Sequence, residues 1–429
     1  MKIAYIAAGA GEMYCGMCIR DSALAAALIA AGHEVTLLPT YTPLHTDDRD
    51  VSDSRLFFGG INVYLQQKSA VFRHTPWLVD RLLNWPKLVR WAAKVNTKTD
   101  PELLGSLTAS MLAGEDGRLR KELAKLVEAL KTTIQPDLVQ LSTVLLVGAA
   151  RQIKAELDVP VLVGLQGEDI FLDGLPDAHR DQCLALLSER AADADGFLSI
   201  STYYAKVAAK RYGIDRERII AVPSGINLEG YTAAPPPPEV FTVGFLARIC
   251  PEKGLHVLVE AVQLLRRSAE GRRCRLLVAG WLAPQERDYL DEVRAKVAEY
   301  GFEHDFEFVG TVDRAEKIRF LQRLTVFSVP TVYRDPRGLC VLEALAAGVP
   351  AVQPRHGVFP ELMSATGGVL LVNPDDPADL AAGLARFMDE PELRYELSEK
   401  GSKAVREHFS ADAMAKATLD AYRRYVDDG

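Results

Sequence analysis

The sequence predicts an α/β protein made of two doubly wound, Rossmann-like domains in tandem. Strands and helices alternate over residues 2–38 and again over 138–222, and the alternation restarts after a run of prolines at residues 235–238. The chain has 429 residues, more than one hydrophobic core usually organises, so length alone favours two domains. Such domains bind ligands at the carboxyl ends of their strands, and two facing domains form an interdomain cleft.

The chain opens with a strand–loop–helix–strand unit. Lys2–Ala8 is an apolar run typical of a buried strand, Asp21–Ala31 is an Ala- and Leu-rich helix that ends at Gly32, and His33–Leu38 is the second strand. This order predicts a parallel sheet with helices on both faces.

Residues 51–130 interrupt the alternation. Leu56–Leu65 has the pattern of a strand pair, and Arg73–Leu130 is mostly helical in pattern and longer than one crossover needs. We therefore expect a helical elaboration of the first domain here. Strands then follow at Leu138–Ser142, Val161–Leu165, Gly196–Ser199 and Ile219–Val222, and helices at Val147–Leu157, Asp177–Ala192 and Thr202–Tyr212.

Four consecutive prolines mark the predicted domain boundary. They continue neither a strand nor a helix, so residues 235–239 are expected to form a stiff linker between domains at 1–234 and 240–410. The strands expected in the second domain are Phe241–Phe245, Arg275–Ala279, Phe306–Val309, Val326–Val329 and Ala351–Gln353. The helices are His256–Ser268, Pro284–Tyr300, Arg314–Leu321, Leu339–Ala347, two more after Gln353, and a terminal helix within 411–429.

Composition narrows the functional classes. Asp plus Glu (58) outnumber Lys plus Arg (50), and the net charge of −8 argues against a general nucleic-acid-binding protein. The apolar runs are too short for a transmembrane helix, and the first ten residues lack the layout of a signal peptide. Six cysteines without regular spacing do not form a disulfide framework. We expect a soluble, cytoplasmic protein.

The strongest chemical signal runs from Asp335 to Glu343, after the strand Val326–Val329 and at the start of a helix. Gly338 and Leu339 would present backbone N–H groups at that helix start, where phosphates bind well. Glu343 lies one turn further on, where its carboxylate could accept hydrogen bonds from sugar hydroxyls. Taken alone, the segment also fits an ordinary capped helix with Asp335 as its N-terminal acid.

A second, cationic segment follows the first strand of the second domain. Arg248 and Lys253 lie in the loop after Phe241–Phe245, at the strand end where a ligand would bind. Two cations there suit a diphosphate, and arginine can bind phosphate oxygens as a fork. Each cation alone could pair with surface acids, but two such segments in one domain favour a phosphate site.

Together these segments resemble the retaining GT-B glycosyltransferases of family 4. The resemblance covers most of the chain, is weakest over residues 51–130, and rests on the order and spacing of several motifs. These are Met1–His33, Val222–Ile226, Arg248, Lys253-Gly254, Asp335-x7-Glu343 with Gly338-Leu339 inside it, and Gly348-Val349-Pro350. The resemblance implies a GT-B hexosyltransferase that moves a sugar from a UDP-sugar, or second a GDP-sugar, to an unidentified sugar, lipid or small-molecule acceptor.

The resemblance implies roles for the matching residues of the second domain. Arg248 and Lys253 would neutralise the leaving diphosphate, and Glu343 would bind the ribose hydroxyls. Backbone N–H groups would hold the phosphates and sugar, Asp335 would face the donor sugar, and two further residues would lie near the base. The backbone donors are Gly338 and Leu339, and the residues near the base are Gly310 and Thr311.

In the first domain, the resemblance implies that Gly11, Glu12 and Gly16 let the backbone approach the donor diphosphate. It also implies that the terminal helix, 411–429, crosses back to this domain. Gln166 stands near the reacting sugar, where the family usually has histidine, and Asp335 stands where the family has glutamate. Glutamine does not titrate, so we expect the leaving phosphate, rather than a side chain here, to act as the base.

Two other patterns in the first domain suggest rival chemistry. The glycines at 9, 11 and 16 fail the dinucleotide pattern G-x-G-x-x-G, because Tyr14 stands at its last position, and no ribose-binding acid ends the second strand. Cys15 and Cys18 form a C-x-x-C between a strand and a helix, which suits either a redox dithiol or small residues lining a phosphate loop.

Val71–Lys98 combines three of the four tryptophans with six basic residues and one acid. This composition suits a peripheral membrane contact or an anionic acceptor, and equally an amphipathic helix with a solvated basic face.

Metal ligands are not indicated by sequence. The eight histidines form no i,i+4 pair, and the triplets Asp48–Asp50 and Asp193–Asp195 lie away from the donor motifs. We expect transfer without a metal or cofactor, with Arg, Lys and helix dipoles supplying positive charge. Two alternatives remain open: a GT-B protein that binds a nucleotide sugar without transferring it, and a GT-B epimerase or hydrolase.

Overall fold

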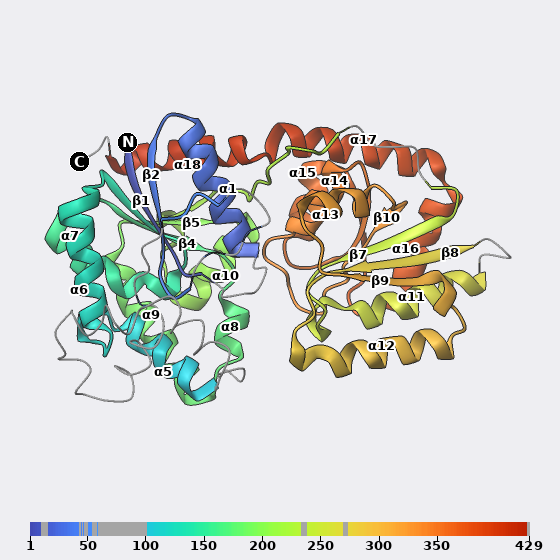
Figure 1. Cartoon of the computed structure of the whole chain (residues 1–429), viewed down its shortest axis with the longest axis horizontal. Helices are drawn as coiled ribbons and strands as arrows, with labels where there is room; N and C mark the ends of the chain where they lie inside the picture. Colours follow the sequence, from blue (N-terminus) through green and yellow to red (C-terminus); the bar gives the residue numbers. More distant parts are fainter. Residues whose placement is uncertain are drawn as a thin grey trace. The chain divides into compact units, whose positions relative to one another are not determined.

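The computed structural model describes residues 1–9, 16–42, 44, 46, 50–53, 58, 101–232, 238–268 and 273–426. Contacts group the chain into two compact units: unit 1 is Met1–Pro223 with Met414–Gly429, and unit 2 is Ser224–Ala413. Each unit contains a six-stranded parallel sheet covered by helices (Figure 1) and has its own hydrophobic core. The predicted fold class, two doubly wound α/β domains, is confirmed.

Unit 1 has the strand order β2-β1-β3-β4-β5-β6. Its strands are β1 (Lys2–Ala7), β2 (Glu34–Pro39), β3 (Leu138–Leu141), β4 (Val161–Leu165), β5 (Gly196–Ser199) and β6 (Ile219–Ala221). Its helices are α1 (Gly16–Ala30), α5 (Pro101–Leu112), α6 (Arg120–Ala129), α7 (Ala150–Leu157), α8 (Asp169–Asp173), α9 (Asp177–Arg190), α10 (Thr202–Tyr212) and α18 (Ala411–Val426).

Unit 1 departs from the sequence prediction at its first helix. Helix α1 begins at Gly16 rather than Asp21, and Asp21 is a buried residue within it. Helices α5 and α6 confirm the helical pattern in the last part of 51–130. The predicted strand pair at 56–65, apart from Phe58, and all of 71–98 lie outside the described residues.

Unit 2 has the order β12-β11-β10-β7-β8-β9. Its strands are β7 (Phe241–Leu246), β8 (Cys274–Ala279), β9 (Phe306–Gly310), β10 (Val326–Phe327), β11 (Ala351–Pro354) and β12 (Val369–Val372). Its helices are α11 (Leu255–Ser268), α12 (Arg287–Glu299), α13 (Arg314–Leu321), α14 (Leu339–Ala346), α15 (Phe359–Thr366), α16 (Pro377–Asp389) and α17 (Pro391–His408). The expectation of two helices after Gln353 is wrong, because β12 and three helices (α15, α16 and α17) precede α18. Gly367 (φ of 62°) ends α15, and the short strand β12 follows it.

The contact boundary between the units differs from the predicted linker. Ile226 donates its backbone N–H to the Phe409 carbonyl (2.9 Å) and accepts from the Ala411 backbone (2.8 Å), which ties the chain after Pro223 to unit 2. The boundary therefore falls at Ser224, before the prolines. Residues 233–237, most of the predicted linker, lie outside the described residues.

Candidate functional site

The strand order of unit 2 reverses between β7 and β10. Open parallel sheets bind ligands at the carboxyl ends of strands beside such a switch point. The loops after these strands meet: the Val332 N–H donates to the Glu252 carbonyl (3.0 Å), and a Cβ on Gly254 (φ of 74°) would lie 1.9 Å from the Pro330 oxygen. Glycine at 254 is therefore required for this close approach.

Lys253, Tyr333 and Asp335 form a hydrogen-bonded triad in these two loops. The Lys253 ammonium donates to the Tyr333 hydroxyl (2.6 Å) and to Asp335 Oδ2 (2.7 Å), and the Tyr333 hydroxyl donates to the same Oδ2 (2.7 Å). The ammonium also lies 4.7 Å from the centre of the Tyr333 ring. An ammonium has three N–H donors, so these bonds leave one for a ligand.

Pairing keeps this buried site charged. Burial alone would raise the pKa of Asp335, but the Lys253 ammonium and then Arg337 outweigh it and hold the pKa well below its usual range. Burial likewise would lower the pKa of Lys253, but Asp335 and Tyr333 hold it above its usual value. Both groups are therefore ionised at neutral pH, and the Lys253 ammonium is held in place as a charged hydrogen-bond donor.

The other Asp335 oxygen shapes the turn into α14. Oδ1 accepts from the backbone N–H groups of Arg337 (2.9 Å) and Gly338 (3.2 Å), and Gly338 has a φ of 65° as the residue before the helix. A short carboxylate side chain reaches its own backbone two and three residues on. The aspartate, where the family has glutamate, fits this local turn.

Replacing Gly338 by alanine tests the turn. An alanine would be strained at this φ, and its Cβ would lie 2.5 Å from Leu362 Cδ1, so we expect Gly338→Ala to lower the free energy of unfolding by about 1–3 kcal/mol. Denaturant unfolding and calorimetric titration with UDP would show lower stability and weaker binding. Gly301→Ala is the control, because its φ is 69° but its Cβ would meet nothing within 4 Å. Equal effects on UDP binding in both variants would contradict a specific role for Gly338.

Glu343, one turn into α14, pairs with Lys317 of α13. Lys317 Nζ donates to Glu343 Oε1 (2.5 Å), and the two side chains are 7% and 13% exposed. A carboxylate can accept several hydrogen bonds, so this pair orients Glu343 and is compatible with a ribose hydroxyl as a further donor.

The remaining predicted residues of unit 2 lie at the same sheet edge. Arg248 is exposed in the loop after β7, and its side chain makes no hydrogen bond or ion pair with the described part of the chain. Gly310 ends β9 with a φ of 87°, and the exposed Thr311 follows it. The structure thus brings Arg248, Gly310 and Thr311 to the edge that carries the triad, while their roles stay predictions.

In unit 1, Gln166 directly follows β4, two strands from β1 in the sheet, and is buried. Its backbone N–H donates to both Glu168 carboxylate oxygens (2.9 and 3.0 Å), and its side chain bonds to Asp21 and Ser142. Gly16 is the first residue of α1. The other predicted residues of this loop, Gly11 and Glu12, and Cys15 of the C-x-x-C lie outside the described residues.

Sequence reasoning missed four residues that contact predicted site residues: Tyr333 and Lys317 in unit 2, and Asp21 and Glu168 in unit 1. Tyr333 and Glu168 each lie two residues from a predicted site residue in a strand-end loop, and that proximity could have indicated them. The other two lie within helices, and only the packed fold brings them beside Glu343 and Gln166.

The described residues give no support for a metal site. No three His, Cys, Asp or Glu side chains of the described residues form a group that could hold a metal ion. Asp193 and Asp195 instead pair with Arg151 (3.1 Å) and Lys154 (2.6 Å). Metal-independent transfer stays a prediction. Within the same described part of the chain, no helix has the length and apolar character needed to cross a membrane.

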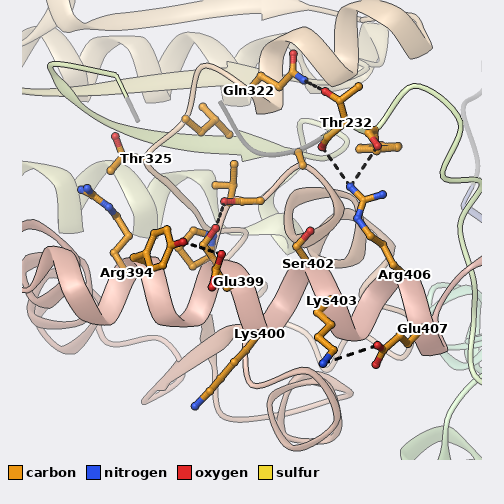
Figure 2. Close-up of a pocket in the computed structure, with 18 residues that line it drawn as sticks. Thr232, Gln322, Thr325, Arg394, Glu399, Lys400, Ser402, Lys403, Arg406 and Glu407 are labelled. Carbon is orange, nitrogen blue, oxygen red and sulfur yellow. Dashed lines mark hydrogen bonds and ion pairs between the residues drawn. The ribbon is translucent and has the colours of Figure 1, made fainter. Parts of the chain in front are cut away.

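A separate hollow of about 1060 Å³ lies along α17 in unit 2 (Figure 2). Thr325 and Pro350, which line it, precede β10 and β11, so it lies at the amino ends of these strands. Arg406 on its wall donates to the carbonyls of Thr232 (3.2 Å) and Ala346 (3.1 Å). Because ligands of such sheets bind at the carboxyl ends, this hollow is not part of the candidate site.

The two units together have the GT-B fold. The solved structure of sucrose-phosphate synthase from Thermosynechococcus elongatus matches all of both chains, with a TM-score of 0.71 and 19% identity. The Anabaena protein HepE in complex with UDP matches 99% of this chain and 100% of its own, with a TM-score of 0.68 and 15% identity.

Family models match most of the chain. Residues 22–229 match "Glycosyltransferase Family 4", and residues 233–404 match "Glycosyl transferases group 1". The chain belongs to this family of GT-B glycosyltransferases, as its motifs predicted.

Curated relatives match over part of their length. D-inositol 3-phosphate glycosyltransferase 2 of Catenulispora acidiphila is 29% identical over 55% of this chain and 57% of that protein. The putative colanic acid biosynthesis glycosyltransferase WcaL of Escherichia coli is 32% identical over 43% of this chain and 46% of its own. The chain spans about half the length of the curated relatives it matches.

Proposed function

We propose that this chain is a glycosyltransferase that takes a sugar from a nucleotide-diphosphate donor held mainly by unit 2. The observation that most directly supports this proposal is the position of the Lys253 ammonium. Hydrogen bonds to Tyr333 and Asp335 hold it at the switch point, and one N–H donor remains. An anchored ammonium can hold a phosphate oxygen with little reorganisation during the reaction.

Two further features support a diphosphate ligand. Arg248 lies exposed on the same loop as Lys253, and the start of α14 at Gly338 and Leu339 adds the positive end of a helix dipole. In the proposed reaction these groups stabilise the negative charge that develops on the diphosphate as the sugar leaves. Glu343, oriented by Lys317, binds the ribose.

The finer features of the reaction are part of this proposal. The sugar is transferred with retention, and the leaving phosphate acts as the base, because Gln166 does not titrate. Transfer needs no metal, because Lys253, Arg248 and the helix start supply the positive charge. A UDP-sugar is the first candidate donor, supported by HepE structures in complex with UDP and UDP-glucose, and a GDP-sugar is the second. The acceptor is a sugar, a lipid or a small molecule, and residues 71–98 are a proposed peripheral membrane contact.

Thermal-shift titration without added metal tests the donor site. Nucleoside diphosphates and nucleotide sugars with different bases should give a stabilising shift for one base, because binding to the folded state adds stability by mass action. Arg248→Ala should weaken that binding about 10- to 100-fold, the effect of losing hydrogen bonds to a charged group. Arg294→Ala, an exposed arginine of α12 with an i,i+3 partner, is the control and should bind as wild type.

Product analysis with the selected donor then separates the remaining classes. Sugar attached to an acceptor supports transfer. Free or inverted sugar indicates a hydrolase or an epimerase, and binding without turnover on every acceptor indicates a nucleotide-sugar-binding protein. An absence of any thermal shift would contradict the proposed donor site.

A further inference from the structure

The hollow along α17 has a row of polar side chains on its helix side. Arg394, Ser398, Ser402 and Arg406 line it and follow one another at intervals of four residues, so they are neighbours along one side of the helix. Figure 2 shows Arg394 and Arg406 toward opposite ends of this row, with Ser402 between them. The helix rises by about 18 Å between the two arginines. The hollow is therefore elongated along α17.

The rest of the lining combines apolar and polar groups. Leu324, Thr325 and Pro350 come from the segments that precede β10 and β11, and the Gln322 amide lies just after α13. Tyr395 of α17 also lines the hollow and is 65% exposed. A lining of hydroxyl, amide and aromatic groups suits a ligand that has both hydroxyls and C–H surfaces.

Three of the four cations that line the hollow already have partners. Lys400 Nζ donates to Glu396 Oε1 (2.5 Å), and Lys403 Nζ lies 4.0 Å from Glu407 Oε1. Arg406 Nη2 donates to three backbone carbonyls at 3.1 and 3.2 Å. The positive charge of these side chains is used by the protein itself.

Arg394 is the exception. It is half-buried, and its side chain makes no hydrogen bond or ion pair with the part of the chain that the structure describes. Burial lowers the pKa of Arg394. At Arg190 burial acts in the same direction, but Glu115 and Asp116 outweigh it and raise the pKa. Partial burial of an uncompensated charge is unfavourable, so Arg394 is better explained by a ligand than by folding.

The charges of the hollow indicate the chemistry of this ligand. A single uncompensated guanidinium matches a single planar carboxylate, which it binds as a fork. Glu399 and Glu407 also line the hollow, and they would repel a multiply charged phosphate. The volume of about 1060 Å³ is at the upper end of the range for small-molecule sites, so it accommodates more than one sugar ring.

We propose that the hollow along α17 binds a short acidic saccharide, whose carboxylate pairs with Arg394 and whose hydroxyls bond to the polar groups of the lining. The proposal does not depend on the donor site. The hollow lies at the amino ends of β10 and β11, whereas Lys253 and Asp335 lie at the carboxyl edge of the same sheet. Both sites can therefore be occupied at once.

Calorimetric titration of the full chain with trigalacturonate tests the proposal, with maltotriose as the neutral trisaccharide. We expect trigalacturonate to bind about 10- to 100-fold more tightly, the effect of hydrogen bonds to a charged group. Arg394→Met should abolish this preference. Arg294→Met, which changes an exposed arginine of α12, is the matched control and should keep it. Arg248→Ala should also keep it, because Arg248 lies at the donor edge.

Thermal unfolding without ligand separates binding from folding. Arg394→Met removes a half-buried charge that has no partner in the described part of the chain, so its unfolding midpoint should equal or exceed that of the wild type. A lower midpoint would show that Arg394 serves the fold and would overturn the proposal.

The titrations can contradict the proposal in three further ways. Equal affinity for the two trisaccharides, or no binding of either, would exclude an acidic saccharide. Loss of trigalacturonate binding in Arg248→Ala but not in Arg394→Met would place the ligand at the donor edge instead. Binding of inorganic phosphate through Arg394 without binding of trigalacturonate would show a general anion site and overturn the assigned class.

Discussion

Lys253→Ala is expected to abolish measurable sugar transfer and to destabilise unit 2. The side chains of Lys253 and Asp335 are 13% and 6% exposed, so the substitution leaves a buried carboxylate without its cation. Breaking such a pair from one side typically lowers the free energy of unfolding by about 3–5 kcal/mol. The anchored ammonium is also lost from the leaving diphosphate, and removing one preorganised donor of this kind lowers kcat by about 10²–10³.

Two variants separate the stability effect from the chemical effect. Lys253→Met combined with Asp335→Asn removes both charges, so it should recover much of the stability and remain inactive. Lys296→Ala breaks the half-exposed pair with Glu260 (2.6 Å), which should change stability by at most about 1 kcal/mol and leave transfer intact. Denaturant unfolding and initial-rate kinetics give both quantities. Near-normal transfer in the charge-free double variant would show that Lys253 acts only in folding.

Glu343→Gln is expected to weaken UDP binding about 10- to 100-fold, because a hydrogen bond to a charged acceptor contributes about 1.5–3 kcal/mol. The loss should be specific to the ribose. Calorimetric titration of the wild type should show weaker binding of 2′,3′-dideoxy-UDP than of UDP, and Glu343→Gln should bind the two equally.

The buried partner of Glu343 complicates this variant and also supplies its control. Lys317 would remain buried without the Glu343 carboxylate, and we expect a lower free energy of unfolding. Adding Lys317→Met to Glu343→Gln removes this buried charge and should restore stability without restoring ribose discrimination. If Glu343→Gln still distinguishes UDP from its dideoxy analogue, Glu343 does not bind the ribose.

The sheet elements of both units were largely predictable, because buried parallel strands are continuous apolar runs bounded by turn residues. Phe241–Leu246 and Val161–Leu165 show this, and both appear within a residue of their expected bounds. The β12 strand was missed because four residues after a pair of glycines carry too little pattern to separate a strand from a loop.

The candidate site was predictable only in part. A loop that follows a strand must lie at the carboxyl end of the sheet, so Arg248, Lys253 and Asp335 could be assigned to one edge from their positions in sequence. Which side chain contacts which depends on strand order and helix packing, which are not local properties. The sequence therefore did not indicate that Lys317 pairs with Glu343. Asp21 was the first residue of the predicted helix, yet it lies buried within α1.

The discontinuity of unit 1 has a consequence for biosynthesis. The chain leaves unit 1 after Pro223 and returns at Met414, and α18 then packs so closely that a Cβ on Gly196 would lie 2.1 Å from the Tyr425 hydroxyl. A ribosome therefore completes every residue of unit 2 before it synthesises the last helix of unit 1. Since domains generally fold as units during synthesis, unit 2 can reach its native state first. The nascent unit 1 remains incomplete until α18 is synthesised. Until then, the β5 surface that α18 covers stays exposed.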